Sequence, residues 1–172
     1  MIVLAPTGIA AINAGGVTIH SFFQVPFRSL CARKLIQRRW QGNLPFFVTG
    51  KRKINIIRSI DLLVIDEISM VRADLLDSVD AVLRRFRDRN KPFGGVQLLM
   101  IGDLQQLAPV VKDDEWQMLR KYYDTPYFFS SQALKQTEYC TIELKKVYRQ
   151  NDGTFLELLN RIRENRCDGQ VL

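Results

Sequence analysis

The stretch LVIDEISM, residues Leu63 to Met70, decides how the rest of this sequence is interpreted. Its apolar residues, several of them β-branched, run directly into two adjacent carboxylates, Asp66 and Glu67. A short, continuous apolar run is typical of a strand that is buried on both faces, as in a parallel sheet covered by helices. Ligands of open parallel sheets bind beyond the carboxyl ends of the strands. We therefore expect both carboxylates at the edge of the sheet that forms the site.

Such a carboxylate pair suits nucleotide hydrolysis. A carboxylate at a strand end, here Asp66, can hold Mg²⁺, because this hard cation prefers oxygen ligands. The next carboxylate, Glu67, can orient and polarise an attacking water. The dipeptide taken alone has a simpler explanation, because Asp and Glu also favour the first turn of a following helix. The apolar run ahead of it favours the catalytic interpretation.

Length and composition indicate one globular domain. The chain has 172 residues, of which 47% are hydrophobic and 25% charged, as in ordinary soluble domains. No apolar run is long enough to cross a bilayer, and no signal-peptide pattern opens the sequence. The three cysteines, Cys31, Cys140 and Cys167, form no CxxC pair, which favours reduced thiols in a cytoplasmic protein, or a nucleoid-associated one if bacterial. The net charge of +7 favours nucleic acid as a partner over a membrane surface.

Strand and helix patterns alternate along the chain. The expected strands cover residues 1–7, 62–65, 96–101, 125–129 and 141–144. The expected helices cover residues 8–14, 30–40, 53–59, 72–88, 113–123 and 153–165, with one further helical turn at 131–134. This alternation predicts an α/β layered domain with a mostly parallel sheet.

Further polar residues follow the predicted strands. Asp103 and Gln106 come directly after strand 96–101, so we expect them at the same sheet edge as Asp66. An amide can hydrogen-bond a terminal phosphate or the attacking water without adding negative charge, although Gln106 also suits a loop held by backbone bonds. Arg149 precedes the last helix, where it can reach a γ-phosphate or form a surface ion pair.

Two segments are candidates for contact with nucleic acid. Thr18 and His20 precede two phenylalanines and can contact a phosphate or a stacked base, although His20 also suits an ordinary hydrogen-bonded histidine. Residues 26–59 are basic and carry interleaved aromatics, a pattern that can follow a nucleic-acid strand. The same pattern also fits a solvated insertion whose aromatic side chains dock onto the domain.

Four blocks of sequence resemble the Pif-type and RecD-like DNA helicases of superfamily one. The blocks are VLAPTGIAAINAGGVTIHSFF from Val3, LVIDEISM from Leu63, MIGDLQQLAPVV from Met100 and VYRQNDGTFLELLNRIR from Val147. Their order is also that of the family. The resemblance implies a three-layer RecA-like domain of the P-loop NTPase type. It also implies ATP-driven 5′-to-3′ translocation on single-stranded DNA and duplex unwinding, in DNA repair, recombination or genome and telomere maintenance.

The resemblance also implies a role for each matching residue. Asp66 matches the acid associated with Mg²⁺, and Glu67 the catalytic base. Gln106 matches the residue that senses the γ-phosphate of ATP, and Arg149 the arginine that contacts it. The residues that match the block contacting single-stranded DNA are Thr7, Thr18 and His20.

The sequence departs from the family in one respect that bears on catalysis. It contains no GxxxxGK[ST] segment, the loop whose backbone amides and lysine cradle the phosphates. We expect residues 1–172 to be a partial first motor domain that lacks the P-loop strand and is inactive alone. In this interpretation residues 26–59 are an insertion, and residues 150–172 lead toward a second motor domain. The missing strand would expose an apolar sheet edge and favour self-association. The alternative is a short, non-catalytic DNA-binding or regulatory protein derived from a helicase domain.

Overall fold

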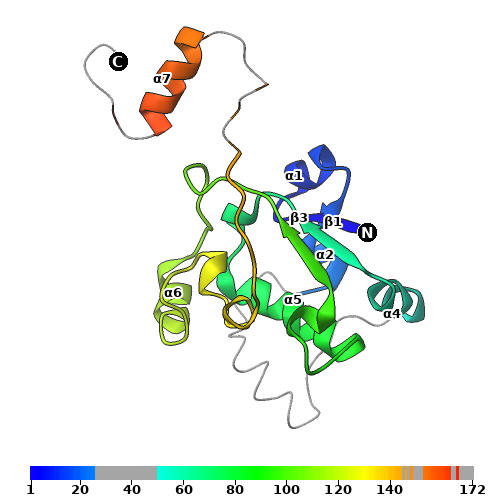
Figure 1. Cartoon of the computed structure of the whole chain (residues 1–172). Coiled ribbons are helices and arrows are strands. Elements are labelled where there is room, and N and C mark those ends of the chain that lie inside the picture. The colour runs from blue at the N-terminus through cyan, green and yellow to red at the C-terminus, as the bar shows by residue number, and fades with distance from the viewer. Residues whose placement is uncertain (26–49, 145, 147, 149–152, 164–165, 167–172) are drawn as a thin grey trace.

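The fold is built on a parallel sheet of four strands in the order β2-β1-β3-β4 (Figure 1). The computed structural model describes residues 1–25, 50–144, 146, 148, 153–163 and 166. The strands are β1 (Ile2–Ala5), β2 (Val17–Thr18), β3 (Leu62–Ile65) and β4 (Gln97–Met100). Three of the predicted strands are thereby confirmed as β1, β3 and β4, and the α/β class is confirmed with them.

Helices and single helical turns separate the strands. The α-helices are α1 (Gly8–Asn13), α2 (Ile19–Phe23), α4 (Lys51–Arg58), α5 (Ala73–Phe86), α6 (Asp113–Leu119) and α7 (Gly153–Arg163). The 3₁₀ turns are η1 (Ile68–Met70), η2 (Pro92–Gly95), η3 (Phe128–Ser130) and η4 (Leu134–Gln136). No helix among these described residues is long and apolar enough to cross a membrane.

The strand β3 is buried on both faces, as its sequence predicts. Leu63, Val64 and Ile65 are 0%, 9% and 0% exposed, and successive strand residues point to opposite faces of a sheet. Its neighbours are β1 on one side and β4 on the other. The helix α5 adds its apolar stripe to the same core, because its hydrophobic residues recur at helical spacing. The core therefore fixes the position of the carboxyl end of β3.

The strand β4 lies at an edge of the sheet. Among the described strands it pairs only with β3. The exposed fractions of Leu99 and Ile101 are 47% and 45%. An open strand edge with exposed apolar side chains is a template for pairing with another chain, and its presence agrees with the apolar edge expected from the sequence.

A buried carboxylate on α5 joins this helix to the segment that follows α6. Asp77 is 3% exposed. Its Oδ1 accepts hydrogen bonds from the Ser131 hydroxyl and from the Ala133 N–H, and its Oδ2 accepts from the Tyr123 hydroxyl and the Gln132 N–H. Buried polar groups need such partners, and here four donors converge on one side chain. The network holds the η3–η4 region against α5.

Two predicted strands are wrong. In residues 125–129 the chain turns into η3, because the Ser130 hydroxyl lies 3.2 Å from the Thr125 N–H, which donates to it, and 2.8 Å from the Thr125 hydroxyl. Only one isolated antiparallel bridge forms there, between Arg72 and Tyr127. Residues 141–144 form no strand and are exposed. A strand needs a neighbour for its backbone N–H and C=O groups, and neither segment pairs with a strand of the described sheet.

Smaller differences concern helix ends. The last predicted residues of α6 instead form a turn in which the N–H groups of Tyr122 and Tyr123 both donate to the Leu119 carbonyl, and Tyr123 reaches Asp77. The helix predicted at residues 53–59 is confirmed as α4. The helix predicted at residues 30–40 lies outside the described residues, as does most of the basic region at 26–59.

A side chain of α4 connects this helix to α2. The Lys53 Nζ donates to the Ser21 carbonyl at 2.7 Å and lies 5.8 Å from the centre of the Phe22 ring. Both helices contribute to the core through Ile57 and Phe23, which are 0% and 1% exposed. The segments on either side of residues 26–49 are thus joined to each other.

Candidate functional site

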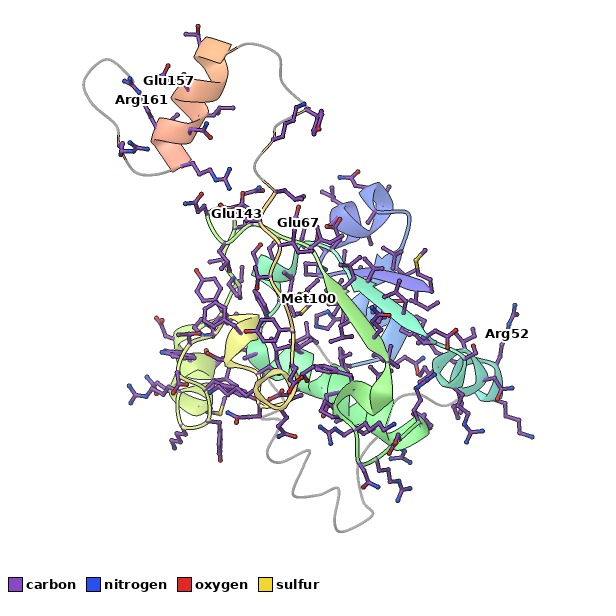
Figure 2. All side chains as sticks on the ribbon, in the orientation of Figure 1. Arg52, Glu67, Met100, Glu143, Glu157 and Arg161 are labelled. Carbon is purple, nitrogen blue, oxygen red and sulfur yellow. The ribbon has the colours of Figure 1, made fainter. Side chains whose placement is uncertain are left out.

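The carboxylates Asp66 and Glu67 follow the central strand β3. The Asp66 N–H donates to the Leu4 carbonyl of β1 at 2.8 Å, so the backbone is still paired at this point. The Asp66 Oδ1 then accepts the Glu67 N–H at 3.0 Å. Glu67 has left-handed backbone angles, φ 51° and ψ 45°, which are unfavourable for a residue with a side chain and are often found at functional sites. Figure 2 shows Glu67 at this end of the sheet, away from Arg52 of α4.

A glycine brings the loop after β4 against this turn. The Ile68 N–H donates to the Ile101 carbonyl at 2.9 Å. A Cβ atom at Gly102 would lie 2.9 Å from the Ile68 Cγ2 and 3.0 Å from its backbone nitrogen. Only glycine allows so close an approach. Gly102 therefore holds the loop that carries Asp103 and Gln106 beside the turn that carries Asp66 and Glu67.

Within this loop Asp103 organises its neighbours. Its Oδ1 accepts the Gln105 N–H at 3.0 Å, and its Oδ2 accepts the Gln106 Nε2 at 2.9 Å. The Arg163 Nη2 of α7 lies 2.9 Å from the same Oδ2. Partial burial acts to raise the pKa of Asp103, but these hydrogen bonds and the Arg163 charge outweigh it and lower the pKa below its ordinary value. Asp103 is therefore ionised and orients the Gln106 amide.

The contact with Arg163 is not predictable from the sequence, because 60 residues separate the partners and α7 reads as a plain amphipathic helix. Asp103 itself is recognisable, because it ends an apolar strand in the same way that Asp66 does. The predicted Arg149 lies outside the described residues.

The two threonines proposed for DNA contact cap short helices. The Thr7 Oγ1 accepts the Ala10 N–H, and the Thr18 Oγ1 accepts the Ser21 N–H, both at 3.2 Å. These bonds satisfy N–H groups that have no partner within the helix. They also fix the hydroxyls of Thr7, which follows β1, and Thr18, the last residue of β2, at the carboxyl ends of these strands.

His20 lies on α2, partly buried near Arg72 and Asp74. Burial lowers the pKa of His20 and the Arg72 charge lowers it further, while Asp74 acts to raise it. The net effect is a pKa below the ordinary value, so the imidazole is neutral at neutral pH. A neutral ring can donate or accept a hydrogen bond but does not add a positive charge to a phosphate contact.

All strands are parallel, so residues that follow them share one edge of the sheet. The residues gathered at this edge are Thr7, Thr18, Asp66, Glu67, Asp103 and Gln106. No group of three or more His, Cys, Asp or Glu side chains that could hold a metal occurs among the described residues. A single carboxylate still suits Mg²⁺, because this ion commonly uses one or two carboxylates together with water and phosphate oxygens. The phosphate cradle for ATP has no counterpart in the 172 residues.

The sequence profile of the family described as PIF1-like helicase matches residues 1–170. The chain belongs to the PIF1-like helicase family. The human ATP-dependent DNA helicase PIF1 is 40% identical over 176 residues, which cover 97% of this chain and 23% of that protein. The Saccharomyces cerevisiae ATP-dependent DNA helicase PIF1 is 40% identical over 171 residues, covering 98% of this chain and 18% of the relative.

Comparison with solved structures leads to the same family. The Bacteroides Pif1 helicase in complex with ADP-AlF3 and single-stranded DNA superposes with a TM-score of 0.86 at 41% identity, over 99% of this chain and 38% of that one. This match confirms the predicted RecA-like fold. The chain thus spans about a quarter or less of the length of these curated relatives.

Proposed function

We propose that this chain is part of the first motor domain of an ATP-dependent helicase that moves 5′ to 3′ along single-stranded DNA and unwinds duplexes. The observation that carries the proposal is the shared position of two loops beyond adjacent strands of a PIF1-like domain. One loop carries the acidic pair Asp66 and Glu67, and the other carries Asp103 and the amide of Gln106. The Bacteroides relative, solved with ADP-AlF3 and single-stranded DNA, supports both the nucleotide and the DNA assignments.

Each residue at the edge has a proposed task. Asp66 holds Mg²⁺, which neutralises phosphate charge when it is bound. Glu67, whose left-handed backbone forms the turn after β3, accepts a proton from the attacking water. Gln106, oriented by Asp103, hydrogen-bonds the terminal phosphate. Arg149 receives the phosphate-contacting role on the basis of the family resemblance.

The chain alone is proposed to be inactive as an ATPase, because it has no GxxxxGK[ST] cradle. ATP hydrolysis by the purified chain is measured with and without single-stranded DNA, and we expect no DNA-stimulated turnover. The Glu67→Gln variant is the control for contaminating ATPases, since a contaminant is unaffected by it. A DNA-stimulated rate that disappears in Glu67→Gln would refute the proposed inactivity and support catalysis by Glu67.

The proposed DNA contact at Thr18 has a test that separates it from helix capping. Asn and Asp both cap helices at least as well as Thr. Thr18→Asp keeps the cap but places a negative charge beside the proposed phosphate, whereas Thr18→Asn keeps the cap without a charge. By fluorescence anisotropy with a labelled oligo-dT, we expect Thr18→Asp to weaken binding about tenfold and Thr18→Asn to change it little. Equal affinities of the two variants would remove Thr18 from the DNA interface.

A second candidate follows from the same missing cradle. The chain could act as a non-catalytic DNA-binding protein derived from a helicase domain. The genomic sequence immediately upstream of the Met1 codon separates the two. An in-frame glycine-rich segment that ends in GKT or GKS supports the helicase, and a stop codon supports the short binding protein.

A further inference from the structure

A basic hollow lies at the amino-terminal end of the sheet, opposite the candidate site. Its volume is about 390 Å³, and its walls include Arg58 at the end of α4, Arg87 and Asp88 after α5, and the η2 residues Gly94 and Gly95, together with Lys91. The helix α4 ends shortly before β3, and η2 ends just before β4. The hollow therefore borders the starts of the two strands whose ends carry Asp66 and Asp103.

The charges around this hollow are mostly uncompensated. It carries three cations, Arg58, Arg87 and Lys91, against one carboxylate, Asp88. The Lys91 Nζ lies 3.9 Å from the Asp88 Oδ2, with the two side chains 70% and 41% exposed, so this pair is weak. The Arg87 Nη1 donates to the backbone carbonyls of Ile57 and Arg58 at 3.4 and 2.5 Å. Because carbonyls are neutral, they fix the Arg87 guanidinium in place without cancelling its charge.

The same guanidinium keeps an unused donor. Among the described residues, no hydrogen-bond acceptor meets the buried Nε of Arg87. Buried donors are normally paired, so this N–H is an exception among the described residues.

The wall formed by η2 is built rigidly and without side chains at two positions. Phe93, Gly94 and Gly95 have φ values of 50°, 64° and 76°. The Phe93 N–H donates to the buried Asp80 Oδ1 at 2.6 Å, and a Cβ at Gly94 would lie 2.7 Å from the Leu83 carbonyl oxygen. The positive φ values and the approach of Gly94 to Leu83 both require glycine here. The turn is thus fixed before any ligand binds.

We propose that this hollow binds a backbone phosphate of nucleic acid. Two excess positive charges, one of them on a guanidinium held in place by two backbone carbonyls, suit a phosphate group. The exposed Arg85 and Arg89 are the chain neighbours of the lining residues Phe86 and Asp88. Several cations in one short segment suit a polyanion better than a single small ion. The inference rests on the proposed DNA binding and adds a contact at the edge remote from Thr18.

Salt dependence tests the proposal. Arg58→Gln/Lys91→Gln removes two exposed cations of the hollow, and Arg120→Gln/Lys121→Gln removes two exposed cations after α6 as a charge-matched control. Binding of labelled oligo-dT is measured across a salt series. Each lost phosphate contact lowers the slope of log K against log salt by about 0.7 for a single strand. We expect the hollow variant, which loses one phosphate contact, to lower the slope by about 0.7 and the control to leave it nearly unchanged.

A second readout reports on the hollow itself. With ¹⁵N-labelled chain, inorganic phosphate is expected to shift the Gly94 and Gly95 amide resonances in the wild type and not in the hollow variant. Far-UV circular dichroism checks that both double variants fold. Equal salt slopes for the two double variants would overturn the proposal. Phosphate-induced shifts combined with equal slopes would show that the hollow binds free anions rather than nucleic acid, and this outcome also overturns the proposal. Equal slopes with the expected weakening by Thr18→Asp leave the proposed function intact, whereas no DNA binding by the wild type overturns both.

Discussion

Replacement of Asp77 by asparagine tests how strongly one buried carboxylate holds the domain together. Asparagine has nearly the same size but only one acceptor oxygen. Each carboxylate oxygen of Asp77 receives one hydroxyl and one backbone N–H: Ser131 with Ala133, and Tyr123 with Gln132. The hydroxyls can rotate, but whichever side the new NH₂ group occupies, one backbone N–H faces another donor.

The expected loss can be worked out from these bonds. A buried N–H without a partner costs about 1–3 kcal/mol, and the remaining bonds weaken by roughly 1 kcal/mol as they lose the charge of the acceptor. Relief of carboxylate desolvation offsets part of this loss. The net expectation is about 2 kcal/mol. With a urea m-value of about 2 kcal/mol/M, the unfolding midpoint should fall by about 1 M.

The assay is urea unfolding followed by circular dichroism, with two controls. Tyr123→Phe removes one of the four bonds to Asp77 and should cost about 1–2 kcal/mol. Asp61→Asn makes the same charge change at an exposed position and should stay within about 0.5 kcal/mol of the wild type. A midpoint for Asp77→Asn that falls no further than that of Tyr123→Phe would show that the backbone donors do not depend on the carboxylate.

Three further predictions concern the turn η2, the histidine and the sheet edge. Gly94→Ala should lower the melting temperature, because its φ of 64° and the 2.7 Å approach to the Leu83 carbonyl together cost roughly 2–4 kcal/mol; an unchanged melting temperature would contradict this packing. The unfolded chain binds a proton at His20 more tightly than the folded chain, since burial lowers the folded pKa below the ordinary 6.5. Stability should therefore be full above about pH 6.5 and fall below it, and urea midpoints for wild type and His20→Gln should diverge as pH falls from about 7.5 to 5.5; parallel curves would refute this. Light scattering at high concentration should detect self-association through β4 that Leu99→Lys reduces, and a strictly monomeric wild type would rule it out.

The parts of the fold that the sequence predicts are those whose signal is local. The apolar run before Asp66 gives β3, and the helical stripe from Leu75 to Phe86 gives α5 together with its Asp80–Arg84 pair, whose Arg84 Nε lies 2.8 Å from the carboxylate. Gly15 and Gly16 likewise mark the end of α1, whose start is capped by Thr7. In each case the residues that decide the structure lie within one or two turns of each other.

The features that the sequence does not predict depend on distant partners. Asp77 reads as a polar residue of an amphipathic helix, because its partners Tyr123 and Ser131 come 46 and 54 residues later. Residues 125–129 have strand-like composition, but a strand forms only beside a sheet edge, and the hydroxyl of Ser130 turns this segment instead. That the loops after β3 and β4 share one edge of the sheet is predictable from the rule for parallel strands, whereas the close passage at Gly102 requires coordinates.

The bond from Lys53 to the Ser21 carbonyl has a consequence for protein engineering. The described residues stop at Val25 and resume at Gly50, and this exposed bond joins the two helices on either side of that gap. Because closure entropy grows by only about 0.6 kcal/mol for each doubling of loop length, a graft of different length between these helices should leave the sheet undisturbed. Chimeras that exchange the corresponding stretch among relatives would then reveal which traits of a helicase belong to the insert and which to the scaffold.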